Sequence, residues 1–313
     1  MKNAERERSS GLSRLTIAGV RFLLSGPNES PAFPLPFQSF RSGDGVTDLG
    51  CEVFCSGPDH ALALQPPAPD KPWSFTVSEG ICEVVRRNQE GVALWQIVGP
   101  LLFNRATVSW NPARFSEFYG SYERAWGTGL GLSLLVLRLC RQGGLVFHGA
   151  AVDVDGHGVL FLGISGTGKS TLSRLFDAAG ATVLTDERPV LRQWPAPGSG
   201  EALPAAAFRV YGSPWPSSAG FARNAWAPLR RVYFIEHGET DRVTPLTPRE
   251  AFNRLIQVAT IPWQDPEILD PCLETVGRLL QSMPCAVLSF RPTPAVVEVI
   301  RADVCRLAAG AGP

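Results

Sequence analysis

The first hundred residues alternate short apolar runs with breaks rich in proline and glycine. The apolar runs lie at residues 51–54, 81–85 and 93–98, and the clearest breaks at residues 25–36 and 66–72. Short apolar runs separated by turn-forming residues are typical of β-strands rather than of long helices. We therefore predict an irregular, β-rich domain over residues 1–110.

A helical period replaces this pattern after residue 110. Phe115, Phe118, Tyr119 and Tyr122 recur at spacings of three and four, which places their side chains on one face of a helix. The leucine-rich residues 130–139 follow and are apolar on all sides, as in a buried helix. We predict that residues 111–142 form a helical segment connecting two domains.

Residues 143–313 alternate predicted strands and helices. Apolar residues 145–154 and 159–162 flank a tight-turn pair, Asp155-Gly156, which predicts a β-hairpin. Strands are also expected at residues 181–185 and 286–290. A hydroxyl or carboxylate residue followed by proline favours a helix N-terminus. We therefore expect helices to begin at Thr247-Pro248, Asp270-Pro271 and Thr293-Pro294, and Glu250 completes a capping box with Thr247.

The composition suits a folded chain with a large apolar core. Of its 313 residues 44% are hydrophobic, and Lys plus Arg (29) equals Asp plus Glu (29). A neutral chain has no broad field to attract nucleic acid or an anionic membrane, so neither is an expected partner. Any phosphate must be bound locally, and lysine occurs only at Lys2, Lys71 and Lys169.

Cysteine usage and hydropathy predict a cytoplasmic protein. The seven cysteines are scattered, and none lies in a pattern of zinc-ligand spacing, so we expect buried, reduced thiols. The first ten residues mix basic and acidic side chains, which argues against a secretory leader. The most apolar window, residues 130–139, contains Arg138 and is far shorter than the about 20 residues of a membrane span.

One motif carries specific chemistry. The run Gly163-Ile164-Ser165-Gly166-Thr167-Gly168-Lys169-Ser170 fits the phosphate-loop pattern G-x-x-x-x-G-K-[ST] at each fixed position. It follows the predicted strand at residues 159–162 and precedes Thr171, where a helix with apolar positions three and four apart begins and continues to residue 179. Strand, glycine loop and helix is the context in which this pattern binds nucleotide.

Each residue type in this motif has a physical role in phosphate binding. The glycines let backbone N–H groups point inward at a helix N-terminus, which attracts anions. Lys169 adds a full positive charge, and the Ser170 hydroxyl is placed to bind Mg²⁺. We therefore expect an ATP- and Mg²⁺-binding site formed by Gly163, Ser165, Gly166, Thr167, Gly168, Lys169, Ser170 and Thr171.

A second candidate is the acidic pair Asp186-Glu187, which ends the predicted strand at residues 181–185. Only one helix and one strand fit between the loop and this pair, so the pair is expected beside the loop at the carboxyl edge of a sheet. One carboxylate would hold Mg²⁺ and the other would act as a base; the sequence does not say which. A solvated strand end is the alternative interpretation. His148, within the predicted strand at residues 145–154, is either a core residue or a third site residue.

These segments resemble a known family. Residues 145–190 resemble the catalytic domain of HPr serine kinase/phosphorylases, which share a phosphate-loop fold with ATP-dependent phosphoenolpyruvate carboxykinases. The resemblance rests on Phe147-His148-Gly149, Val152-Asp153-Val154, Gly158-Val159-Leu160, residues 163–170 and residues 181–188. Residues 209–236, with Tyr211-Gly212-Ser213-Pro214-Trp215 and Pro228-Leu229-Arg230-Arg231, look like the shorter, divergent members found in peptide natural-product gene cassettes, among them lasso-peptide precursor kinases. The resemblance is looser over residues 205–310 and weak over the first domain.

The resemblance implies roles for individual residues. It implies an α/β phosphate-loop kinase core, with Lys169 and Ser170 on phosphates and Mg²⁺, Asp186 as a metal residue, and Asp186, Glu187 and His148 as catalytic residues together with Lys169. The family usually has aspartate where this chain has Glu187. Bifunctional members have a glutamate where this chain has Thr171, and their Glu-x-Arg-Gly motif has no clear counterpart here. These departures weaken the implication of phosphorylase activity and of HPr itself as substrate.

We therefore expect an ATP- and Mg²⁺-dependent kinase that phosphorylates a hydroxyl, in our hypothesis a serine, on a small protein or peptide. Arg209, Arg230 and Arg231 are candidate contacts for phosphate or an acidic substrate, although they also fit a plain protein surface. Two alternatives are a non-catalytic ATP-binding scaffold in a peptide-modification pathway and a small-molecule kinase. The sequence leaves the acceptor and homo-oligomer formation open.

Overall fold

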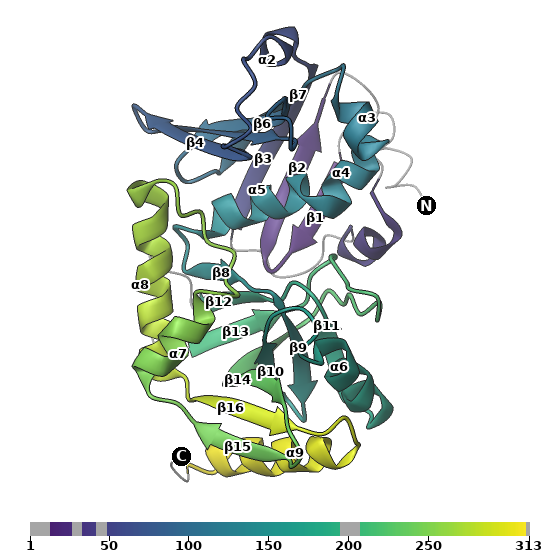
Figure 1. The fold of residues 1–313 in the computed structure, drawn as a ribbon, viewed down its shortest axis with the longest axis vertical. Helices are drawn as coiled ribbons and strands as arrows, with labels where there is room; N and C mark the ends of the chain where they lie inside the picture. The colour runs from purple at the N-terminus through teal and green to yellow at the C-terminus, as the bar shows by residue number, and fades with distance from the viewer. Residues whose placement is uncertain (1–12, 27–32, 42–48, 195–206, 311–313) are drawn as a thin grey trace. The chain divides into compact units, whose positions relative to one another are not determined.

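The structure is a computed structural model that describes residues 13–26, 33–41, 49–194 and 207–310. The chain divides into two compact units, one formed by residues 1–141 and 262–269 and the other by residues 142–261 and 270–313. Both units are mixed α/β structures (Figure 1). The first ten residues and part of the break at residues 25–36 lie outside the described residues, so the expectations for them stay predictions.

The described strands of the first unit form one mixed seven-stranded sheet, in the order β1-β2-β3-β7-β6-β5-β4. The β-rich pattern expected from the sequence is confirmed here, because each apolar run lies in a strand. The strands are β1 (Ser13–Ile17), β2 (Val20–Ser25), β3 (Leu49–Pro58), β4 (Trp73–Ser78), β5 (Ile81–Arg87), β6 (Ala93–Pro100) and β7 (Arg105–Trp110).

Three helices follow the strands of this unit in sequence, where the aromatic and leucine periods predict a helical segment: α3 (Phe115–Tyr119), α4 (Tyr122–Thr128) and α5 (Leu130–Leu139). Two short helices, η1 (Leu35–Phe40) and α2 (His60–Ala63), lie between strands. Arg138 is buried within the apolar α5, where its guanidinium donates to the carbonyls of Gly50 at 2.8 Å and Leu102 at 3.0 Å. These bonds compensate the burial of a charge inside an otherwise apolar helix.

The second unit is built on a nine-stranded mixed sheet, in the order β11-β9-β10-β14-β13-β12-β8, with β16 paired to β14 and β15 paired to β16. Its strands are β8 (Gly144–Val146), β9 (Gly149–Val154), β10 (His157–Leu162), β11 (Thr182–Thr185), β12 (Val190–Trp194), β13 (Ala207–Tyr211), β14 (Trp226–His237), β15 (Arg242–Pro245) and β16 (Cys285–Phe290). The predicted hairpin is β9–β10, whose turn residues Asp155 and Gly156 have φ of 53° and 86°.

The predicted strand at residues 145–154 is wrong in one respect, because it is broken at Phe147 and His148. β8 pairs with β12, whereas β9 pairs with β10 and β11. Between them the backbone N–H of His148 donates to the carbonyl of Val258 at 2.7 Å, and that of Phe147 to Pro189 at 3.1 Å. His148 therefore lies at the end of a strand rather than inside one.

Helices α6 (Lys169–Ala178), α7 (Pro248–Leu255), α8 (Pro266–Ser282) and α9 (Ala295–Ala308) complete the fold. α6 and α9 bury Leu172, Phe176, Val297 and Ile300 in one apolar cluster with the central strands. The capping box expected at Thr247 is present, and α9 begins directly after Thr293-Pro294.

The helix start expected at Asp270-Pro271 is wrong, because α8 begins earlier, at Pro266, and Pro271 lies inside it. Asp265 accepts a hydrogen bond from the N–H of Glu267 at 2.9 Å, so Asp265-Pro266 provides the same cap-plus-proline signal. Proline has no N–H to donate to the carbonyl four residues earlier, which is that of Glu267. The Arg141 guanidinium donates to this carbonyl at 2.7 Å instead, which makes the internal proline tolerable.

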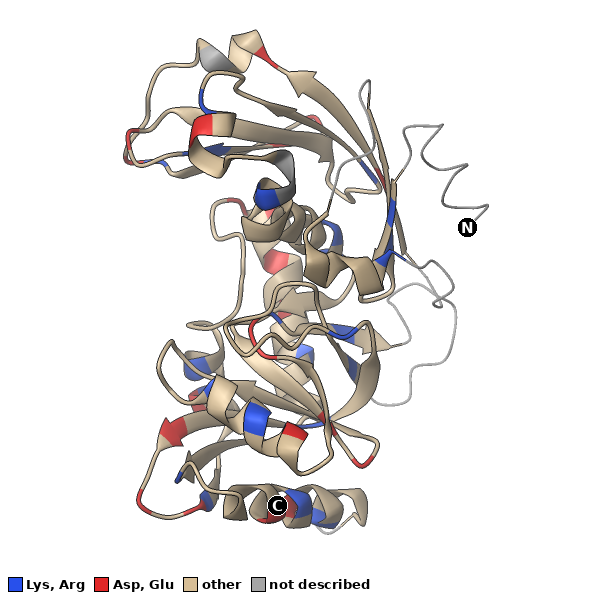
Figure 2. Ribbon diagram, turned by 90° about the vertical axis from the view of Figure 1, so that its right-hand side faces the viewer, with Lys and Arg blue, Asp and Glu red and all other residues tan. Residues whose placement is uncertain are grey.

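Figure 2 shows basic and acidic residues interspersed over the elements of both units, in keeping with the absence of net charge. Among the described residues, no helix is both long and apolar enough to cross a bilayer.

Three strands of the second sheet bring separate segments to one edge. β9 is antiparallel to β10 and to β11, with Gly149 opposite Leu162 and Ala151 opposite Thr185. β10 and β11 therefore run in the same direction on either side of β9. The chain after Leu162, the chain after Thr185 and the chain before Gly149 meet at this edge, which we call the carboxyl edge.

Candidate functional site

The glycine loop at residues 163–170 connects β10 to α6 at the carboxyl edge. Gly166 and Gly168 have φ of 87° and 99°, a region that favours glycine because other residues are strained there. α6 begins at Lys169, two residues before the helix predicted from Thr171. Among the described residues, no side chain caps the N-terminal N–H groups of α6, so these donors are available to an anion. Ser165 is exposed, whereas Thr171 is half-buried in the first turn of α6.

Within the loop, Thr167 and Lys169 bond to backbone carbonyls. The Thr167 hydroxyl donates to the carbonyl of Ile164 at 2.8 Å. The Lys169 Nζ donates to the carbonyls of Gly163 and Ile164, both at 2.8 Å. Burial lowers the pKa of the Lys169 ammonium, because the charged form loses hydration, and the carboxylate of Glu187 opposes that shift. The loop thus encloses one positive charge.

His237 also holds the loop, and the sequence offered no signal for it. Its Nε2 lies 2.9 Å from the carbonyl oxygen of Gly166, and its ring stacks on Phe290 with centroids 6.3 Å apart. These two residues are paired in β14 and β16. Phe290 in turn lies against Gly168, where an added Cβ would approach the ring to 2.8 Å.

Gly168→Ala is expected to destabilise the fold by about 1–2 kcal/mol through strain at positive φ, plus the cost of displacing Phe290. Gly166→Ala is the matched control, because its φ is also positive but nothing lies within 4 Å of the added Cβ. Urea unfolding should give a larger loss for Gly168→Ala than for Gly166→Ala. Equal losses would show that contact with Phe290 does not constrain the loop.

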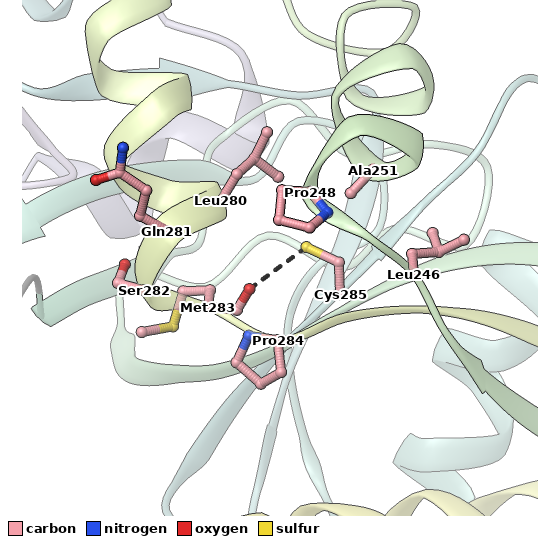
Figure 3. A pocket seen from close by; sticks show the side chains of 9 residues that line it. All are labelled: Leu246, Pro248, Ala251, Leu280, Gln281, Ser282, Met283, Pro284 and Cys285. Atoms are coloured by element: carbon pink, nitrogen blue, oxygen red, sulfur yellow. Dashed lines mark hydrogen bonds between the residues drawn. The ribbon is translucent and has the colours of Figure 1, made fainter. Parts of the chain in front are cut away.

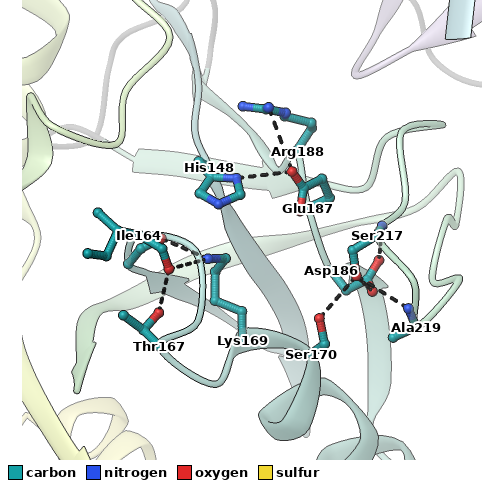
Figure 4. A network of polar contacts seen from close by, with 11 residues as sticks. His148, Ile164, Thr167, Lys169, Ser170, Asp186, Glu187, Arg188, Ser217 and Ala219 are labelled. Carbon is teal, nitrogen blue, oxygen red and sulfur yellow. Dashed lines mark hydrogen bonds and ion pairs between the residues drawn. The ribbon is translucent and has the colours of Figure 1, made fainter. Parts of the chain in front are cut away.

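A second group at this edge links Ser170 to Asp186 through Ser217 (Figure 4). The Ser170 and Ser217 hydroxyl oxygens lie 3.0 Å apart. The Ser217 hydroxyl donates to Asp186 Oδ2 in a short hydrogen bond, and the Ser217 N–H donates to Asp186 Oδ1 at 3.0 Å. Asp186 is 0% exposed, so these bonds compensate the burial of its charge. The sequence offers no signal for Ser217, which is 47 positions from Ser170.

The third group joins Glu187 to His148 and Arg188 (Figure 4). His148 Nδ1 lies 3.1 Å from Glu187 Oε1, and Arg188 Nη2 lies 3.6 Å from the same oxygen. The Glu187 side chain is 24% exposed. The backbone contributes too, because the Gly149 N–H donates to the carbonyl of Glu187 at 3.1 Å.

These contacts lower the pKa of Glu187. The hydrogen bond with His148 is the largest cause, burial opposes it, and the charges of His148, Arg188 and Lys169 add to the lowering. A carboxyl with a lowered pKa in the folded state stabilises the fold above its unfolded pKa, and this contribution is lost as pH falls through the folded pKa. Glu187 is therefore ionised at neutral pH.

Because the stabilisation by Glu187 is lost in acid, the melting temperature of wild type should exceed that of Glu187→Gln by more at pH 6 than at pH 3. Thermal unfolding over a series of pH values measures the difference. The same comparison in a His148→Ala background should show a weaker pH dependence, since the largest cause of the shift is gone. A difference that stays flat with pH, or grows toward acid, would contradict the assigned pairing.

The residues present fit a nucleotide with Mg²⁺. Mg²⁺ prefers oxygen ligands, and Ser170, Ser217 and Asp186 supply two hydroxyls and a carboxylate beside the loop. Within the described part of the chain, no three His, Cys, Asp or Glu side chains gather into a group that could hold a metal. A metal at this edge would therefore depend on hydroxyl oxygens and on phosphate as well as on Asp186.

The candidate arginines are held by other groups. Arg231 is buried, and its Nε lies 3.4 Å from Asp303 Oδ2. The Arg209 guanidinium lies 3.8 Å from the ring centroids of both Trp194 and Trp226. The expectation that Arg231 contacts phosphate or substrate is wrong, because its charge is paired inside the protein. Arg230 is half-buried on β14.

Two cavities elsewhere contain none of the predicted site residues. One, of about 230 Å³, lies between the N-terminus of α7 and the C-terminus of α8 (Figure 3). Burial raises the pKa of the Cys285 thiol on its wall to about 12, so that thiol is not a nucleophile at neutral pH. The other, of about 360 Å³, lies on the sheet of the first unit beside Phe54 and Ile81.

Comparison with models of known protein families found no match for this chain, and comparison with curated proteins found none either.

Proposed function

We propose that this protein is an ATP- and Mg²⁺-dependent kinase that phosphorylates a hydroxyl, a serine of a small protein or peptide. The observation that carries the proposal is the meeting of three groups at one sheet edge. These are the glycine loop with Lys169, the Ser170–Ser217–Asp186 group, and Glu187 with His148. Phosphoryl transfer depends on positioning and on charge neutralisation, and this edge offers both.

Each residue of the site has a separate role in the proposed reaction. The N–H groups at the start of α6 and the Lys169 ammonium bind phosphate oxygens, and bound Mg²⁺ supplies further neutralisation of their charge. Asp186 serves the metal, because Ser217 links its carboxylate to Ser170, the loop hydroxyl assigned to Mg²⁺. Glu187 accepts the proton of the acceptor hydroxyl, because it is ionised and partly exposed. His148 holds the Glu187 carboxylate in place.

The acceptor class rests on the resemblance to HPr serine kinases. Glu187 extends one methylene further than aspartate does, so the acceptor hydroxyl would lie correspondingly farther from the backbone of β11. Cytoplasmic residence and independence from nucleic acid and membranes remain part of this proposal.

Incubation with γ-labelled ATP, Mg²⁺ and a panel of serine-containing peptides and small proteins tests the proposal. Wild type should label a serine in at least one of them. Label recovered only in a small metabolite would mean that the protein is a small-molecule kinase. ATP binding without any turnover would favour the non-catalytic scaffold. Transfer that is unchanged in Lys169→Ala would contradict the proposed site.

A further inference from the structure

The segment between β13 and β14 reaches the carboxyl edge and is held there by backbone contacts. The Arg223 N–H donates to the carbonyl of Leu184 at 2.9 Å, and Ala222 forms a β-bridge with Thr185. Gly212 fits closely, since an added Cβ would lie 2.0 Å from the carbonyl oxygen of Arg223. This segment is therefore fixed against β11, the strand that carries Asp186.

Ser217 is the residue of this segment that enters the site. The Ser217 hydroxyl donates its single proton to Asp186 Oδ2. Ser217 Oγ then accepts from the Ser170 hydroxyl at 3.0 Å and from the Ala219 N–H at 3.3 Å. The Ser217 oxygen thus contacts an oxygen of Ser170 on one side and an oxygen of Asp186 on the other.

The separation of the two serine oxygens equals that of adjacent ligands around Mg²⁺. Octahedral Mg²⁺ binds oxygens at about 2.0–2.1 Å, so adjacent ligands lie about 3.0 Å apart. The Ser170 and Ser217 oxygens are separated by 3.0 Å.

We propose that Ser217 is a third protein ligand of the Mg²⁺ site, beside Ser170 and Asp186. This inference rests on the proposed function, since the metal is the one that accompanies ATP. It ties metal binding to the segment at residues 212–223, which a loop-and-aspartate site alone would not do. With only one carboxylate in the set, tight metal binding requires the nucleotide phosphates.

Replacing Ser217 with cysteine tests the ligand role, because a thiol disfavours Mg²⁺ and favours soft metals such as Cd²⁺. Calorimetry with a non-hydrolysable ATP analogue should show Mg²⁺-dependent affinity reduced about 10-fold or more in Ser217→Cys and Ser217→Ala. Cd²⁺ should restore nucleotide affinity in Ser217→Cys alone and produce thiolate-to-Cd²⁺ absorption. Ser218→Cys, at the adjacent exposed residue, is the matched control and should show neither effect.

The outcomes separate this inference from the function on which it rests. Wild type that fails to bind the analogue with Mg²⁺ would overturn the proposed function. Wild type that binds it, with unchanged affinity in both Ser217 variants, would overturn the ligand role only. Affinity lost in both variants without recovery by Cd²⁺ would also overturn it, because Ser217 would then act by holding Asp186.

Discussion

Lys169→Ala is expected to reduce phosphoryl transfer from ATP by about 100-fold or more, the usual cost of removing one group that stabilises transition-state charge. Lys169 is 6% exposed, and its ammonium is held at the loop by two carbonyls at 2.8 Å. It is thus positioned before any phosphate arrives. Initial rates with γ-labelled ATP at saturating acceptor measure the loss.

Two controls make this result interpretable. Lys71 is an exposed lysine of the first unit, and Lys71→Ala should keep the wild-type rate. Removing Lys169 also leaves two carbonyls without their donor, so circular dichroism and thermal unfolding must show that the variant is folded. A folded Lys169→Ala protein with the wild-type rate would rule out the loop as the phosphate site.

The second large effect concerns stability. Asp303→Ala should lower the free energy of unfolding by about 3–5 kcal/mol, the cost of leaving a buried charge without its partner. Asp303 accepts from the Tyr233 hydroxyl at 2.6 Å and lies 3.4 Å from Arg231 Nε. The side chains of Arg231 and Asp303 are 2% and 8% exposed. Burial and the adjacent carboxylate raise the pKa of Tyr233, which therefore stays a neutral donor.

Urea unfolding measures this loss, and Glu298→Ala is the control because Glu298 is another acidic residue on α9. The Glu298 side chain is 73% exposed and pairs with Arg301 at the surface, so its removal should cost less than about 1 kcal/mol. Should Asp303→Ala fail to fold, Asp303→Asn keeps the side-chain shape and should still be less stable than Glu298→Ala. Similar losses for the Asp303 and Glu298 variants would contradict the buried pair.

The parts of the site predicted from sequence are those that local spacing determines. The glycine loop is a contiguous motif, and the short interval to Asp186 and Glu187 allows only one helix and one strand. Ser217 and His237 could not be predicted this way, because they reach the loop from 47 and 71 positions away. Nothing in their immediate neighbours marks them as site residues.

The errors also have physical causes. A continuous apolar run hides the break at His148, because the strands on both sides of it are buried. Proline after a carboxylate marks a helix start at both Asp265 and Asp270, and only the contact of Arg141 with the Glu267 carbonyl shows why the second proline is internal. The sequence leaves Arg231 as a candidate substrate contact or a surface residue, because nothing local reveals that it pairs with Asp303, 72 positions away.

The central claim is that the loop at residues 163–170 binds ATP with Mg²⁺, and calorimetric titration of ATP into the protein tests it most directly. We predict one site per chain, tighter with Mg²⁺ than with EDTA, and strongly weakened in folded Lys169→Ala. No binding of ATP by folded wild type at millimolar concentration, or equal binding by wild type and Lys169→Ala, would contradict the claim.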